Sequence, residues 1–179
     1  MKNLESIKSL RQKIVSKNNY VSNTPGVYRW WFKEDVLGLG TFPKFTNNLK
    51  LQRKIIDSDT YYALYFGMSK NMEERIKWHI CNAHKPSAVK SGFLSTLRQS
   101  ISALLEVPMS QSQSYVNKFM DDYCYLEWDY TKTVQDAKNI EHTELTQHDY
   151  SYPLNIQGNT TVTKEHLKKL KKLRTDFKK

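Results

Sequence analysis

Apolar residues near the start of the chain recur at the spacing of a single helical face. This period predicts an amphipathic helix over residues 3–17. The same period returns later in the chain. Asn71 followed by Glu74 has the spacing of an N-terminal capping box, which marks the start of another helix. That helix carries the apolar seam Met72, Ile76 and Ile80, and further helices are predicted over residues 94–105, 113–121 and 134–147.

Three other segments have the composition of β-strands. Val27–Phe32 and Tyr61–Phe66 are dense in aromatic and other strand-forming residues. Tyr123–Tyr130 alternates apolar and polar positions, as a half-buried strand does. The first two can pair as an antiparallel hairpin with an inserted loop. The pattern therefore predicts an α/β domain of the α+β type, with a small three-stranded, mainly antiparallel sheet flanked by helices.

Two connections are long and polar. Residues 33–59 show little periodicity beyond a short helix predicted over residues 49–57, and residues 83–93 are basic and loop-like. A long connection inside a small domain is usually functional or mobile. After a loop at Pro153, the tail over residues 164–179 places lysines around spaced leucines. This tail predicts a helix that either contacts phosphates or packs its leucines on the core with its lysines in solvent.

Composition narrows the class of protein. A length of 179 residues predicts one domain, and 28 Lys plus Arg against 18 Asp plus Glu give a net charge of +10. This charge favours a polyanionic partner, of which nucleic acid is the commonest. Cys81 and Cys124 make no disulfide scaffold, and His79, Cys81 and His84 do not have the spacing of a zinc site. Because no leader or apolar span is evident, we expect a soluble cytoplasmic protein without a membrane partner.

A few residues could carry phosphodiester chemistry. Arg75 and His79 are four residues apart on a predicted helix, so phosphate-binding and proton-transferring side chains share one face. Glu141 lies at the margin of an apolar helix face, where a carboxylate is costly unless it is paired or binds a metal. Glu144, one turn later, is a rival for that role. Taken singly, each residue also fits an ordinary core or surface position.

The order of these residues resembles the GIY-YIG nuclease family. Gly26-Val27-Tyr28 is similar to the first tyrosine motif of that family, and Tyr65-Phe66-Gly67 is similar to the second. Arg75 follows Tyr65 by ten residues, at the family's arginine position. The later matches are His79, the Ala137–Glu141 spacing of the metal-binding helix, and a loop with Pro153 and Asn155. The resemblance covers residues 25–159, the core of a single catalytic domain over residues 1–179.

The resemblance implies a role for each matched residue. Tyr28 and Tyr65 would flank the attacking water, and Tyr28 is the better candidate for the base or for the group that orients it. The other implied roles are phosphate binding by Arg75, proton transfer or phosphate contact by His79, retention of Mg²⁺ (or Mn²⁺) by Glu141, and bracing of the site by Asn155.

The chain departs from the family pattern at three places. The two tyrosine motifs lie 37 positions apart, where compact members have a short turn. Long gaps of this kind occur in restriction-enzyme-like members, whose insertions contact DNA. Phe66 stands where an aliphatic residue is usual. The stretch between Glu141 and Asn155 is long for the family, which makes Asn159 a rival to Asn155.

The implied function is a metal-dependent DNA endonuclease. We favour a type II restriction or defence enzyme that acts on duplex DNA as a homodimer, because cutting two strands with one site per chain calls for two chains. The alternative is a non-catalytic or structure-specific nucleic-acid-binding protein on the same fold. The expected DNA contacts are the insertion at 33–59, the basic tail, and the residues Lys70, Lys85, Lys90 and Arg98.

Overall fold

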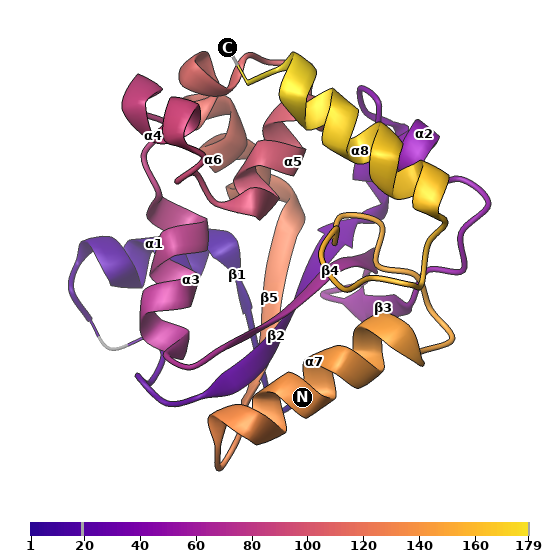
Figure 1. The fold of residues 1–179 in the computed structure, drawn as a ribbon. Helices are drawn as coiled ribbons and strands as arrows, with labels where there is room; N and C mark the ends of the chain where they lie inside the picture. Colours follow the sequence, from indigo (N-terminus) through magenta and orange to yellow (C-terminus); the bar gives the residue numbers. More distant parts are fainter. Residues whose placement is uncertain (19, 179) are drawn as a thin grey trace.

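A computed structural model, which describes residues 1–18 and 20–178, shows an α+β fold built on one antiparallel sheet (Figure 1). The strand order is β1-β5-β2-β4-β3, and every pair of neighbours is antiparallel. The two tyrosine motifs therefore lie on adjacent strands, β2 and β4, although they are distant in sequence. The strands are β1 (Asn3–Ser6), β2 (Gly26–Lys33), β3 (Arg53–Ile56), β4 (Asp59–Ser69) and β5 (Cys124–Tyr130).

Helices cover both faces of the sheet. One face packs against five helices in the main hydrophobic core, namely α1 (Ile7–Val15), α3 (Met72–Cys81), α5 (Thr96–Leu104), α6 (Gln113–Tyr123) and α8 (Lys164–Asp176). The opposite face packs against α7 (Val134–Thr146) and the loop that follows it. Shorter elements are α2 (Pro43–Thr46), α4 (Pro86–Ser91) and the 3-10 helices Glu34–Gly38 and Met109–Gln111. Within the described residues, none of the helices combines the length and apolarity that crossing a membrane requires.

The central strand β2 is buried along almost its whole length. Tyr28, Trp30 and Phe32 enter the main core, while Val27 and Trp31 enter the smaller core under α7. Because successive side chains on a strand point to opposite faces, one short segment contributes to both layers.

The three predicted strands are confirmed, but the sheet has five strands and not three. Residues 3–6, predicted as the first turn of a helix, form β1, which pairs with β5, and the helix begins only after its cap, Ser6. Leu4 fits the helical period by spacing alone, yet it lies 41% exposed on the sheet edge. Four-residue strands carry too little periodicity to be recognised from sequence.

The helix predicted over residues 49–57 is also wrong. Arg53–Ile56 is the edge strand β3, joined to β4 by Asp57 and Ser58, which both have positive φ (49° and 72°). Two consecutive residues with positive φ form the tight turn that matches the twist of a hairpin. The segment 83–93, predicted as a loop, contains the short helix α4.

The prediction of a half-buried third strand needs correction too. Glu127 on β5, assigned to the polar face by alternation, is only 4% exposed. It lies opposite Arg29 of β2 in the sheet register, beneath α7. Glu127 therefore does not mark a solvated face, because it takes part in a buried ionic network.

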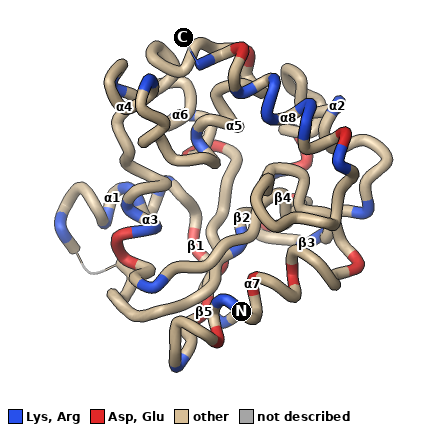
Figure 2. Tube along the Cα trace, viewed as in Figure 1, with Lys and Arg blue, Asp and Glu red and all other residues tan. Residues whose placement is uncertain are grey.

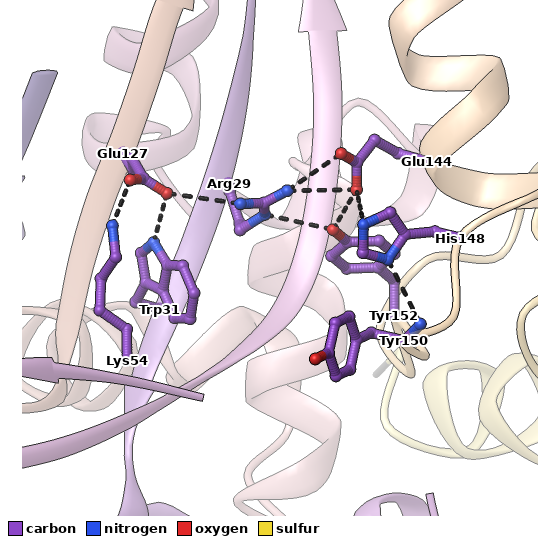
Figure 3. Close-up of polar contacts among 8 residues, drawn as sticks. All are labelled: Arg29, Trp31, Lys54, Glu127, Glu144, His148, Tyr150 and Tyr152. Atoms are coloured by element: carbon purple, nitrogen blue, oxygen red, sulfur yellow. Dashed lines mark hydrogen bonds and ion pairs between the residues drawn. The ribbon is translucent and has the colours of Figure 1, made fainter. Parts of the chain in front are cut away.

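Arg29 is the centre of this network (Figure 3). It is 8% exposed, and its guanidinium reaches Glu127 on β5 at 3.5 Å and both carboxylate oxygens of Glu144 on α7 at 3.1 Å. Its Nε donates to the Tyr152 hydroxyl at 3.2 Å. Glu127 also accepts from Trp31 at 2.9 Å and contacts Lys54 of β3. The network therefore fastens α7 and the following loop onto three strands.

Replacing Arg29 by Met should destabilise the fold strongly. The substitution leaves two buried carboxylates without their shared cation, so the free energy of unfolding should fall by about 3–5 kcal/mol. Urea unfolding followed by circular dichroism measures this change.

The matched control is Lys118→Met, which breaks the exposed pair between Lys118 and Asp122 on α6. It should change the free energy of unfolding by less than about 1 kcal/mol. Similar small losses in the two variants would contradict a stabilising role for the Arg29 network.

Candidate active site

The site is built at the open edge of β4. β3 pairs only with Asp59–Tyr62, so no strand among the described residues lies beside the second half of β4 on that side. Side chains take the place of a strand there. The Phe66 N–H donates to Asn155 Oδ1 at 2.8 Å, and the Met68 N–H donates to Glu141 Oε1 at 3.0 Å. Since buried backbone donors need partners, the sheet edge itself positions two of the predicted site residues.

A pocket of about 560 Å³ opens beside this edge. It brings together residues from both helical layers, because α3, α5 and α8 approach it from one face of the sheet and α7 from the other. Five of the six residues predicted as catalytic line it, and the sixth, His79, lies directly behind Tyr28. The lining includes Tyr28, Tyr65, Arg75, Glu141, Asn155 and Arg174.

Tyr28 and His79 form a buried hydrogen-bonded pair. The Tyr28 hydroxyl lies 2.8 Å from His79 Nε2, and His79 Nδ1 lies 2.7 Å from Ser95 Oγ. Burial lowers the pKa of His79 well below its usual range, with Arg75 and Arg98 acting in the same direction. Burial raises the pKa of Tyr28 well above 10. Both side chains are therefore uncharged at neutral pH.

Gly67 makes room for the Tyr28 ring. A Cβ at this position would lie 2.6 Å from both Cζ and the hydroxyl oxygen of Tyr28. No side chain fits at that distance, so the glycine of the second motif allows the tyrosine of the first to reach the pocket. Tyr65 lies beside Tyr28 with ring centroids 6.4 Å apart, and its hydroxyl is 3.5 Å from Thr96 Oγ1 on α5.

Arg75 is one helical turn before His79 on α3 and lines the pocket. Its guanidinium lies over the Trp78 ring at 5.0 Å from the centroid. Among the residues that the structure describes, no carboxylate comes within ion-pair distance of it. Its charge nevertheless influences the pKa values of Tyr28, His79 and Glu141. Arg75 is thus an available cation beside the Tyr28–His79 pair and the Glu141 carboxylate.

Glu141 is the available carboxylate of α7. Burial raises its pKa, while the Met68 N–H and Arg75 oppose that rise. In the described part of the chain only Oε1 has a hydrogen-bond partner, and no group of three His, Cys, Asp or Glu side chains is arranged to hold a metal. Glu144, the rival from sequence, is occupied by Arg29 and Tyr152 in the buried network. A metal ion here would be anchored by Glu141 alone, and Mg²⁺, which keeps several waters, accepts such an anchor.

The two candidate asparagines have different places. Asn155 holds the main chain of Phe66 at both ends, accepting from its N–H and donating to its carbonyl at 2.7 Å. Asn159 donates to the carbonyls of Tyr152 and Asn155 at 2.8 and 3.0 Å. Asn155 therefore contacts β4 at Phe66, between Tyr65 and Gly67 of the second motif. Asn159 fixes the loop that carries Asn155.

The predicted nucleic-acid contacts divide into two groups. Lys70, Lys85 and Lys90 are exposed, and Lys70 lines a second hollow that shares Arg75 and Trp78 with the main pocket. The prediction that Arg98 contacts nucleic acid is wrong, because its side chain is fully buried.

Arg98 instead closes the end of α3. It donates to the carbonyl of Ile80 at 2.8 Å, to His84 Nε2 at 2.8 Å and to Asn117 Oδ1 at 2.6 Å. The bond to Ile80, with a further one to the His79 carbonyl at 3.2 Å, satisfies carbonyls at the C-terminus of the helix that carries Arg75 and His79. Arg98 thus has a structural place beneath the site and no access to a nucleic acid.

Two site features were missed from sequence. Ser95, the N-cap of α5, supports His79, and Arg174 of α8 reaches the pocket. A serine before a helical period is a recognisable cap, but its contact with a distant histidine is not visible in the sequence. Arg174 is the single arginine among the tail lysines, which is a weak signal by itself.

Comparison with known proteins identifies the family. The model of the GIY-YIG catalytic domain matches residues 26–176. Neither the curated proteins nor the solved structures contain a match to the chain. The family match implies nuclease activity on a nucleic acid, and it covers every pocket residue described above. The chain therefore belongs to the GIY-YIG family of nucleases.

Proposed function

We propose that this protein is a metal-dependent endonuclease that hydrolyses phosphodiester bonds in duplex DNA. One observation carries the proposal. Arg75, which has no carboxylate partner among the described residues, and Glu141, which has one oxygen without a partner there, line the same pocket as the Tyr28–His79 pair. A phosphate between them would meet a cation, a metal anchor and a proton acceptor together.

Tyr28 and His79 would act as a relay for the proton of the attacking water. In the tautomer that carries its proton on Nδ1, His79 donates to Ser95 Oγ and accepts from the Tyr28 hydroxyl at Nε2. Tyr28 can then take a proton from water while passing its own to His79. The lowered pKa of His79 means that the ring is neutral at neutral pH, so Nε2 accepts the hydrogen bond from Tyr28 before substrate arrives.

Arg75 would neutralise the phosphate. Its planar fork suits phosphate oxygens, and packing on Trp78 limits its conformations before substrate arrives. Positioned charges that need no reorganisation are the usual source of transition-state stabilisation. Arg75 would therefore contribute both to binding and to the stabilisation of developing charge.

Glu141 would hold the divalent cation, Mg²⁺ or Mn²⁺. The Met68 N–H fixes one carboxylate oxygen, and the other is left for a metal ligand. When bound, such an ion supplies Lewis acidity to the phosphate and its leaving oxygen. Asn155 supports this arrangement indirectly, since it holds the strand that carries Tyr65 and the Met68 amide.

The net charge of +10 and the exposed lysines support a nucleic acid as partner. Figure 2 shows where the lysines and arginines lie along the chain. The hollow next to the pocket, lined by Lys70, Trp78 and Phe93, offers a path for the strand beside the cut.

A restriction or defence role, with two chains acting together on two strands, is the subclass we propose. It predicts discrete fragments from a plasmid and a dimer on DNA.

Replacing Glu141 by Gln should abolish cleavage while preserving the fold. Glutamine still accepts the Met68 N–H, but it lacks the charge that a metal anchor needs. Cleavage of supercoiled plasmid in Mg²⁺ should fall by at least about 100-fold, as removal of several kcal/mol of metal stabilisation implies. Chelation of the wild-type protein with EDTA should have the same effect, and gel electrophoresis measures both.

Glu73→Gln, an exposed carboxylate on α3, is the matched control and should cleave like wild type. Wild-type cleavage that persists in EDTA would exclude metal dependence. Binding without any cleavage by the wild-type protein would favour the alternative, a non-catalytic nucleic-acid-binding protein.

Replacing Tyr28 by Phe should slow cleavage without weakening substrate binding. The ring still packs on Gly67, and only the hydroxyl of the relay is lost. The turnover rate should drop roughly 100- to 10,000-fold, the usual contribution of general acid–base groups. Single-turnover cleavage and anisotropy binding separate the two effects, and exposed Tyr115→Phe is the control. A Tyr28→Phe enzyme with the wild-type rate would remove Tyr28 from the mechanism.

A further inference from the structure

The C-terminal helix delivers a second arginine to the active pocket. Arg174, on the last turn of α8, lines the same pocket as Arg75 and Glu141. It is half-buried, and within the described residues no carboxylate lies at ion-pair distance from it. Its Nη2 donates to Gln99 Oε1 on α5 at 2.7 Å. The Gln99 amide is neutral, so the half-buried guanidinium lacks a counter-ion among the residues that the structure describes.

The other basic residues of α8 have a different environment. Its lysines are exposed, and Lys169 and Lys172 pair with Glu165 and Asp176 one turn away. The leucines of the helix face the core, with Leu170 fully buried. The tail therefore packs as an ordinary amphipathic helix, and Arg174 alone is directed from it into the pocket.

The orientation of Arg174 is fixed before any ligand binds. Gln99 is buried, and its Nε2 donates to the Leu94 carbonyl at 2.6 Å, so its Oε1 is left to face Arg174. Burial lowers the pKa of Arg174, and the nearby Tyr65 hydroxyl acts in the opposite direction. The guanidinium therefore lies on the Tyr65 and α5 side of the pocket, while Arg75 enters from α3.

We propose that Arg174 forms a second phosphate-binding subsite, which contacts the nucleic-acid backbone at the phosphate next to the one held by Arg75. This inference rests on the proposed function. It adds that the C-terminal helix α8 takes part in binding the nucleic-acid backbone. Two arginines from separate helices, each without a carboxylate partner in the described chain, line the same pocket, so a bound strand would meet a cation from each helix. Because Gln99 already holds the Arg174 guanidinium, this side chain loses little conformational entropy when it binds a phosphate.

The test compares Arg174→Gln with Lys172→Gln, which removes the same charge from an exposed position of the same helix. Both are made in the Glu141→Gln background so that the probe, a fluorescein-labelled DNA duplex, stays intact. Arg174→Gln should weaken binding roughly tenfold, as expected for the loss of a charge-assisted hydrogen bond. The slope of log K against log salt should become shallower by about 0.9. Lys172→Gln should change neither quantity.

A second measurement separates binding from folding and from chemistry. Thermal unfolding should show that Arg174→Gln is folded, and Arg174→Lys should restore part of the affinity because it returns the charge without the fork. With Glu141 intact, Arg174→Gln should raise KM for cleavage more than it lowers kcat. A fall in kcat alone would indicate that Arg174 contacts the scissile phosphate itself, and it would overturn the subsite as proposed.

The two proposals fail in distinguishable ways. Wild-type protein that cleaves DNA, together with an Arg174→Gln variant that binds and cleaves as wild type does, would overturn the subsite alone. Wild-type protein that neither binds nor cleaves would overturn the proposed function, and the subsite with it.

Discussion

The site depends on how the unpaired edge of β4 is satisfied. A strand edge presents backbone donors that need partners, and β3 is too short to cover the edge beyond Tyr62. Asn155 and Glu141 complete it from two different elements. The same bonds that terminate the sheet therefore place a carboxylate beside Tyr65, and loss of either partner would disturb structure and site together.

The two faces of the sheet contribute differently to this edge. The face toward α3 and α5 supplies the neutral Tyr28–His79 pair, supported by Ser95. The face toward α7 supplies the Arg29 network, which fastens α7 through Glu144, one turn after Glu141. Buried ion pairs contribute little net stability but penalise misplacement heavily. The network therefore serves mainly to fix where α7 lies on the sheet, and so where the Glu141 carboxylate meets the edge.

A feature of the fold or of the site could be predicted from the sequence when residues close together in the chain determine it. Arg75 and His79 share a helix face by spacing alone, and the two tyrosines belong to motifs that follow one another in the family's order. The main residues of the pocket could therefore be predicted from the sequence. β1 and β3 are too short to show a period. Arg98 belongs to a basic segment, which predicts a DNA contact, but helix-end carbonyls, His84 and Asn117 hold its guanidinium in the interior. Where α8 docks, and hence Arg174, is decided by packing between distant elements.

Charge is distributed in the pocket according to the cost of burial. The groups that would exchange a proton are deeply buried and neutral, while Arg75, Glu141 and Arg174 are only half-buried. Desolvating a neutral hydroxyl or imidazole costs far less than desolvating an ion. The interior can therefore hold the proton-transferring pair in a fixed geometry before substrate arrives. In the proposed mechanism, the charges at the rim would retain part of their hydration until a phosphate replaces it. The substrate, and not the fold, would then complete the charge balance of this pocket.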